Sequence, residues 1–315
     1  MKSRPKIGLA LGGGSARGMT YIGIFKVLEK HKIPIDYISG TSIGAIIGAL
    51  FASGISAKKM EELILSTEWI KLLEPSDFKK GLITHERITK YLREQLGDKK
   101  FEDLEIPLAV TAVDINNGRE VIFDSGDVVQ AVNASMSIPG LFTPVQIGKH
   151  FYVDGGVIDP IPLGVLRRKN IDKIIAVDLS MDLEHYKFAN APEPEAKQPI
   201  LDNIIEKTAT NIKDYLKGNK IIPKSLLWAF NPRAIVQALQ NSPSEIFQIS
   251  AKSFSIMESE LTRCKLAEFK PDVVIRPNIP NISLLDFHKY KSAIKKGEYA
   301  ARKQLPAIKK LAGIK

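Results

Sequence analysis

The sequence contains little of several features that would point to particular classes of protein. It has one cysteine in 315 residues, which excludes an internal disulfide framework and fits a reducing compartment. The neighbours of Cys264 predict a buried helix position. The longest apolar run, residues 43–52, is far shorter than the roughly 20 residues that a membrane span needs. The basic N-terminus precedes too few apolar residues for a signal-peptide core, so we expect a soluble, cytoplasmic protein.

Two phosphate-binding signatures are also incomplete. The glycine-rich segment 8–18 follows a short apolar strand and precedes an apolar helix, which is a favourable place for an anion. A Walker loop needs a lysine after its last glycine, but Met19 follows Gly18. A dinucleotide fingerprint counted from Gly12 needs a third glycine where Arg17 stands. A nucleotide-binding regulatory protein remains the alternative from another class.

Ser42 lies in the pattern G-x-S-x-G at residues 40–44. An extended apolar segment, residues 35–39, comes before it and a helix of small apolar residues follows it. This arrangement of strand, sharp turn and helix is typical of a nucleophile elbow, in which glycines remove side chains that would collide with the turn. Because acyl transfer also needs oxyanion donors from a loop after an earlier strand, segment 8–18 favours an oxyanion site over a phosphate site.

A serine nucleophile needs a base within hydrogen-bond reach, and histidine is the usual one. The chain has five histidines. A hydrolase of the Ser, Asp, His order would pair Asp154 with His185 or His288, yet neither histidine follows a strand that would hold it rigidly. His150 lies about 13 Å along an extended strand from Asp154. Asp154 itself closes a short strand, in a sequence that alone would indicate an ordinary Asp-Gly turn.

Several motifs in this order resemble the patatin-like phospholipase family of bacterial serine acyl hydrolases. The resemblance rests on GGGSARG at 12–18, GTSIG at 40–44, ASMSIPGLFTPV at 134–145 and DGG at 154–156. It covers about residues 5–180 and resumes at about 262–297. The chain departs from the family at Ser15, where members usually carry a fourth glycine. Backbone N–H groups of this loop should still form an oxyanion hole with Ser15 in place of glycine, unless Ser15 needs a positive φ.

The resemblance implies a Ser-Asp dyad without histidine, with Ser42 as the nucleophile and Asp154 as the base. It also implies an oxyanion hole of backbone N–H groups from Gly13, Gly14 and Ser15. Arg17 matches the family's motif arginine, for which an orienting role is expected. The other motif positions that support these loops are Gly12, Gly18, Gly40, Gly44, Gly155 and Gly156.

From these residues we predict a serine acyl hydrolase that cleaves an ester of a phospholipid or lysophospholipid through an acyl-enzyme. A lipid transacylase is the first alternative, because it uses the same dyad and differs only in whether an alcohol replaces water. With an ordinary pKa near 4, Asp154 would be fully ionised at neutral pH. The reaction needs no metal and no cofactor.

The order of predicted elements indicates an α/β fold, a three-layer sandwich with a mainly parallel central sheet and a helical insertion. Residues 1–181 and 263–315 are expected to form the hydrolase domain and residues 182–262 the insertion. Pro243 lies in a capping-box sequence that predicts a helix start. The apolar segment 221–230 fits a contact within the insertion, with a lid or a homodimer contact as alternatives.

The net charge of +10 is concentrated at the C-terminus, where residues 289–315 hold nine basic residues against Glu298 alone. Leu305, Ile308 and Leu311 recur there at helical spacing. This pattern suits either a helix docked on the domain or a helix at a membrane surface, attracted by anionic headgroups of a lipid substrate. No nucleic-acid motif accompanies it, so nucleic acid is not an expected partner. We do expect peripheral contact with the inner membrane surface.

Overall fold

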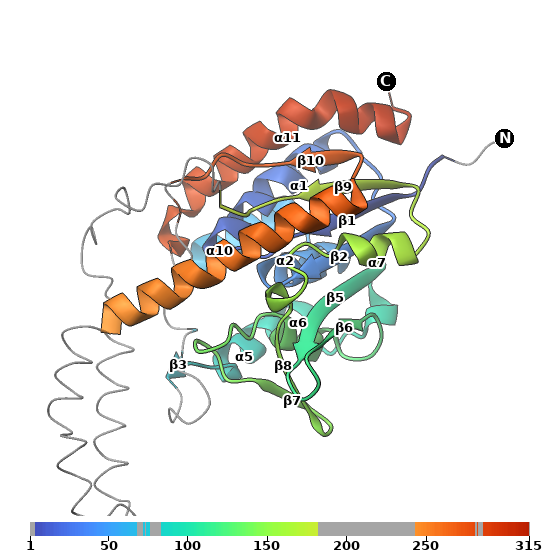
Figure 1. Ribbon diagram of the computed structural model, residues 1–315. Helices are drawn as coiled ribbons and strands as arrows, with labels where there is room; N and C mark the ends of the chain where they lie inside the picture. Colours follow the sequence, from blue (N-terminus) through green and yellow to red (C-terminus); the bar gives the residue numbers. More distant parts are fainter. Residues whose placement is uncertain are drawn as a thin grey trace, which may run out of the picture.

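A computed structural model describes residues 4–67, 83–181, 243–280 and 286–314, together with residues 72, 74, 75 and 282. In these residues an eight-stranded sheet of order β10-β9-β1-β2-β5-β8-β7, with β6 on β5, lies between two layers of helices (Figure 1). The five strands from β10 to β5 run parallel to one another. The predicted three-layer α/β fold with a mainly parallel sheet is confirmed.

The elements have the following bounds. The strands of the main sheet are β1 (Ile7–Leu11), β2 (Tyr37–Thr41), β5 (Leu108–Asp114), β6 (Arg119–Phe123), β7 (Val145–Ile147), β8 (His150–Asp154), β9 (Lys173–Val177) and β10 (Val273–Ile275). A separate pair is formed by β3 (Glu74–Pro75) and β4 (Ile83–Thr84). The α-helices are α1 (Thr20–Lys30), α2 (Ile43–Ala52), α3 (Ala57–Ser66), α5 (Glu86–Leu96), α6 (Val128–Ser135), α7 (Leu163–Arg168), α10 (Pro243–Phe269) and α11 (Tyr290–Ala312). Short 3-10 turns include η1 (Ser15–Met19), η3 (Gly155–Val157) and η5 (Phe287–Lys289).

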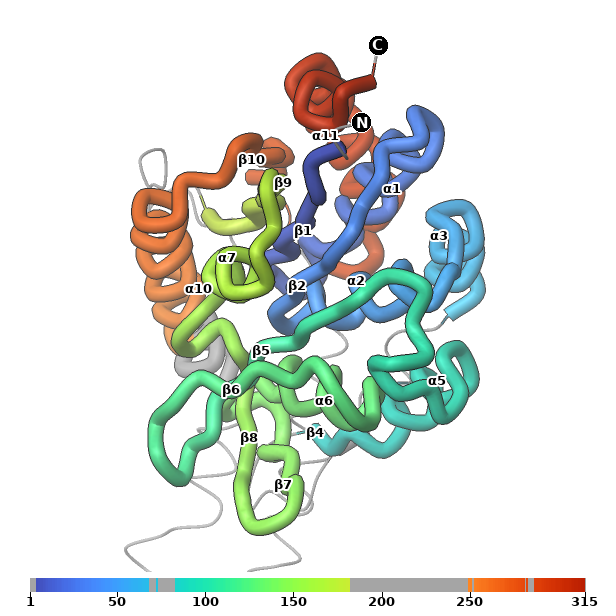
Figure 2. The backbone as a smooth tube through the Cα atoms, turned by 90° about the vertical axis from the view of Figure 1, so that its right-hand side faces the viewer, coloured from blue at the N-terminus to red at the C-terminus, as the bar shows by residue number. Residues whose placement is uncertain are grey.

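The two faces of the sheet are covered by different sets of helices. Successive side chains of a strand point to opposite faces, so Leu9 and Leu11 enter the larger core while Ala10 enters the smaller one. Figure 2 shows α1, α2, α3 and α11 on one side of the sheet and α7 and α10 on the other. The smaller core is completed by Leu266 and Phe269 at the end of α10.

Strand β5 brings two distant strand ends together. One edge of β5 pairs with β2 in parallel, and this pairing ends where Thr41 lies opposite Thr111. From Ala112 onward the same edge pairs with β8, in the antiparallel sense, with Asp154 opposite Ala112. The opposite edge is occupied by β6. The C-terminal ends of β2 and β8 therefore meet on neighbouring residues of β5, and this junction positions the candidate site.

Two long helices, α10 and α11, lie in the described part of the chain after residue 242. The helix start predicted at Pro243 is confirmed, and α10 runs on to Phe269, through the boundary expected between residues 262 and 263. Segment 221–230 lies outside the described residues. The prediction for Cys264 was wrong, because this side chain is exposed on α10. Helix α11 docks on the domain with Ile308 fully buried. Within the described residues, no helix is long and apolar enough to cross a bilayer.

Candidate active site

Ser42 occupies a strained turn between β2 and α2. Its φ of 56° and ψ of −122° lie outside the regions that side chains favour. The residue is the N-cap of α2, so the first N–H groups of this helix surround it. The backbone N–H of Ser42 donates to Oγ of Ser135 at 2.8 Å. Only 5% of Ser42 is exposed. This is the geometry of a nucleophile elbow.

The glycines flanking Ser42 are required by close backbone packing. A Cβ on Gly40 would lie 2.6 Å from the carbonyl oxygen of Gly44. A Cβ on Gly44 would lie 2.2 Å from the carbonyl oxygen of Leu11. Both distances are below any tolerable contact, and the obstructing atoms are backbone, so they cannot rotate away. The elbow therefore rests directly on the end of β1.

Asp154 ends β8 beside this elbow. Its side chain is 1% exposed, Oδ1 accepts the N–H of Gly156 at 2.7 Å, and Oδ2 has no hydrogen-bond partner among the described residues. Burial raises the pKa of Asp154 to about 7, although the Ser42 side chain and the Gly156 N–H act to lower it. The expectation of an ordinary pKa near 4 was therefore wrong. A carboxyl with a pKa near neutrality is better matched to general-base catalysis.

The end of α6 and the residues that follow it hold both Ser42 and Asp154 in place. Ser135 accepts the N–H of Ser42, as described above, and the carbonyl oxygen of Ser137 accepts the N–H of Asp154 at 2.9 Å. The turn after Asp154 is equally constrained, because a Cβ on Gly155 would lie 2.5 Å from the carbonyl oxygen of Thr111. The structure thus brings Ser42 and Asp154 together, and the two serines of segment 134–145 had no assigned role in the sequence.

The glycine-rich loop lies next to this pair. The N–H of Gly13 donates to the carbonyl oxygen of Pro160 at 2.8 Å, so it is already occupied. The N–H groups of Gly14 and Ser15 donate to no described residue. Gly14 has a φ of 147° and Ser15 a φ of 49°, a region that favours glycine, so the one departure from the family motif carries backbone strain. Of the remaining motif glycines, Gly12 lies in the glycine-rich loop, Gly18 in η1 and Gly156 in η3.

Arg17 anchors the glycine-rich loop to two later segments. Its guanidinium donates to the carbonyl oxygens of Ile282 at 3.0 Å and Leu179 at 3.3 Å. Burial lowers the pKa of Arg17, and the nearby Glu258 partly offsets this. These contacts fit an orienting role.

No described histidine hydrogen-bonds to Ser42 or Asp154. His85 contacts Ser137 and Thr143, while His150 pairs with Asp114 at 2.7 Å. His288 lies in η5, and His185 is outside the described residues. Among the described residues, no cluster of three or more histidine, cysteine or acidic side chains could hold a metal ion.

The structure adds Glu258, which sequence reasoning missed. This residue of α10 is 9% exposed, and its carboxyl lies against Gly13 and Gly156. Burial and the neighbouring Asp154 raise the pKa of Glu258 to about 8, while Arg17 acts to lower it. Nothing local in the sequence distinguishes it from other helical glutamates.

The comparison with known families agrees with this geometry. The family model of patatin-like phospholipase matches residues 9–167, just over half of the chain. The chain belongs to the patatin-like phospholipase family. It is therefore a lipid ester hydrolase, and the nucleotide-binding alternative is set aside.

Relatives of this patatin-like chain fall into two groups. An uncharacterized NTE family protein of Mycobacterium tuberculosis is 27% identical over 97% of this chain and 93% of its own length. Lysophospholipase NTE1 of Debaryomyces hansenii is 28% identical over 91% of this chain, which spans only 17% of that protein. Among solved structures, VipD of Legionella pneumophila has a TM-score of 0.46 at 14% identity and matches 97% of this chain and 67% of VipD.

Proposed function

We propose that this patatin-like protein hydrolyses phospholipid or lysophospholipid esters through a Ser42–Asp154 dyad and an acyl-enzyme. The observation that carries the proposal is the junction on β5, where a strained serine and a buried, otherwise unpartnered carboxyl oxygen come from two strand ends. The similarity to lysophospholipase NTE1 supports the substrate class.

In the proposed reaction, Oγ of Ser42 attacks the ester carbonyl while Asp154 accepts the hydroxyl proton. The N–H groups of Gly14 and Ser15 stabilise the developing oxyanion, since that of Gly13 is engaged with Pro160. One such donor is worth about 3–4 kcal/mol of transition-state stabilisation. Asp154 then protonates the leaving alcohol and later deprotonates the water that releases the fatty acid.

The test compares Ser42→Ala and Asp154→Asn with the wild type, using lysophospholipid and a short soluble ester. Both variants should lose at least about 1,000-fold in kcat, because each removes a group that takes part in bond making. His288→Ala is the control and should keep wild-type activity. Mass spectrometry should find an acyl group or a fluorophosphonate on Ser42. Full activity of either dyad variant would contradict the proposal, and analysis of the lipid products separates hydrolysis from transfer to an alcohol.

We also propose that α11 attracts the protein to anionic lipid surfaces. Its apolar side is used in docking on the domain, whereas Lys291, Lys295, Arg302 and Lys303 are exposed. Binding should then be electrostatic and fall with salt. Cosedimentation with anionic vesicles at 50 and 500 mM NaCl measures this, and binding that is insensitive to salt would contradict it.

A further inference from the structure

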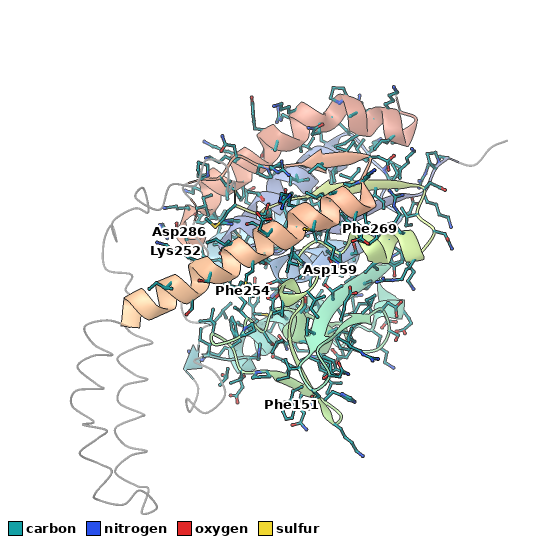
Figure 3. All side chains as sticks on the ribbon, in the orientation of Figure 1. Phe151, Asp159, Lys252, Phe254, Phe269 and Asp286 are labelled. Carbon is teal, nitrogen blue, oxygen red and sulfur yellow. The ribbon has the colours of Figure 1, made fainter. Side chains whose placement is uncertain are left out.

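Helix α10 covers the candidate active site with a polar face. Four buried side chains recur at helical spacing on it, namely Ser255, Glu258, Ser259 and Thr262. Figure 3 shows the helix lying across the domain, with Phe254 and Phe269 labelled along its length. A buried helix face normally presents apolar side chains to its core. Apolar packing on the domain therefore does not account for the polar side chains on this face of α10.

Glu258 projects from this face into the space beside the nucleophile. A Cβ on Gly13 would lie 2.6 Å from Oε1 of Glu258, and the same point would lie 3.7 Å from Cβ of Ser42. A Cβ on Gly156 would lie 2.8 Å from the same carboxyl oxygen. The carboxyl is thus inserted between the oxyanion loop and the turn that follows Asp154.

This position is unfavourable for a carboxyl. Burial withdraws it from water, which is costly for the ionised form of a carboxyl. Burial and the neighbouring Asp154 raise the pKa of Glu258, and protonation lowers this cost. Buried, perturbed carboxyls beside a reactive group are typical of functional sites.

Little space is left around the inserted carboxyl. A cavity of about 10 Å³ beside Glu258 is lined by Gly13 and Thr262, and by neither Ser42 nor Asp154. That is room for about one water molecule. Ser42 and Asp154 are almost fully buried, so an ester can reach Ser42 only after part of the surrounding structure moves.

The two ends of α10 are held differently. Its C-terminal end is fixed by apolar packing of Leu266 and Phe269. Farther toward the N-terminus, the hydroxyl of Ser259 accepts the N–H of Met181 at 2.9 Å, and large apolar side chains face outward. These outward side chains are Ile249, Ile256 and Met257, with exposures of 59, 39 and 52%. Ile256 and Met257 directly precede Glu258, so the apolar patch and the inserted carboxyl move together.

We propose that α10 is a gate, in which Glu258 fills the closed site and contact of Ile249, Ile256 and Met257 with a phospholipid surface withdraws it. A phospholipid surface is the occupant because the exposed apolar patch adjoins the candidate site of a lipid ester hydrolase. The inference rests on the proposed function of Ser42 and Asp154.

The first test measures the rate at which a small soluble fluorophosphonate labels Ser42 in the full-length protein. Glu258→Ala should label about tenfold faster than the wild type without vesicles, and phosphatidylcholine vesicles should accelerate the wild type more than the variant. Glu260→Ala is the matched control, because Glu260 pairs with Arg263 on the solvent side of the same helix. Its labelling rate should be unchanged. A Glu258→Ala rate within twofold of the wild type would overturn the gate.

A second test does not depend on Glu258. Met181→Cys with Ser259→Cys, in a Cys264→Ser background, places a disulfide where the Met181–Ser259 hydrogen bond now joins α10 to the domain. Oxidation should reduce vesicle hydrolysis at least tenfold and slow labelling of Ser42, and reductant should restore both. Equal activity of the oxidised and reduced forms would overturn the gate even if wild-type labelling at Ser42 supports the dyad. Absence of Ser42 labelling in every form would overturn the dyad, and the gate with it.

Discussion

The region of β1, β2 and α2 and the helix α10 both lie against Ser42, but they are held by different interactions. In the first region backbone packs on backbone, and the glycines at 40 and 44 leave no space for even a methyl group. In the second, a helix presents small polar side chains and the buried carboxyl of Glu258. A region packed so closely fixes the positions of reacting atoms, whereas a helix whose buried face is polar gains less free energy from burial than one with an apolar face. If α10 is the proposed gate, the geometry of the site and access to it belong to separate parts of the molecule.

The largest effect is expected from one methyl group added to the closely packed region of β1, β2 and α2. Gly44→Ala places a Cβ 2.2 Å from the carbonyl oxygen of Leu11, and backbone on both sides prevents relaxation. We expect a loss of at least about 3 kcal/mol in the free energy of unfolding. Urea unfolding followed by circular dichroism measures it.

Gly48→Ala is the control on the same helix. Its Cβ would lie 3.2 Å from the side chains of Ile38 and Leu11, which can adjust. The change should stay within about 1 kcal/mol, since alanine also favours the helix. Equal losses in both variants would show that the elbow is no more tightly constrained than the rest of α2.

The second prediction concerns the pH dependence of the reaction. With a pKa of about 7, Asp154 is the base only above that pH, so kcat/KM for a soluble ester should fall about tenfold per pH unit below 7 and level off above it. An aspartate with an ordinary pKa would give a flat profile from pH 5 to 9. Such a flat profile, with the fold intact by circular dichroism, would contradict the assignment of the buried carboxyl as the base.

The third prediction concerns the side of the site formed by α10. The pKa of Glu258 is raised from 4.5 to about 8, so between these values the folded protein holds a proton that the unfolded chain has lost. The free energy of unfolding should therefore fall as the pH rises from about 4.5 to 8 and change little above. Urea unfolding at pH 5, 7 and 9 should show a smaller decrease for Glu258→Gln than for the wild type. Glu260→Gln, exposed on the same helix, should keep the wild-type slope.

The sequence predicted the region of β1, β2 and α2 better than it predicted the contribution of α10 to the site. The elbow is a local pattern, because β2, Ser42 and α2 are consecutive and their glycines follow from the turn itself. The parallel sheet follows from alternating strands and helices. The pairing of Ser42 with Asp154 came from family resemblance, since the shared edge of β5 is a matter of strand order, which no local pattern specifies. Glu258 and the raised pKa of Asp154 were missed because both depend on which distant helix covers the site.

The smallest predicted effect lies in the oxyanion loop, where Ser15 replaces the family's usual glycine. Its φ of 49° costs a side chain about 1 kcal/mol, so Ser15→Gly should raise Tm by about 2 °C in a thermal melt. Lys32→Gly is the control, because Lys32 has a φ of 51° in the turn after α1. Both variants should gain similarly if backbone strain alone is relieved. A gain for Lys32→Gly without one for Ser15→Gly would mean that the Ser15 side chain stabilises the loop by more than the strain it introduces.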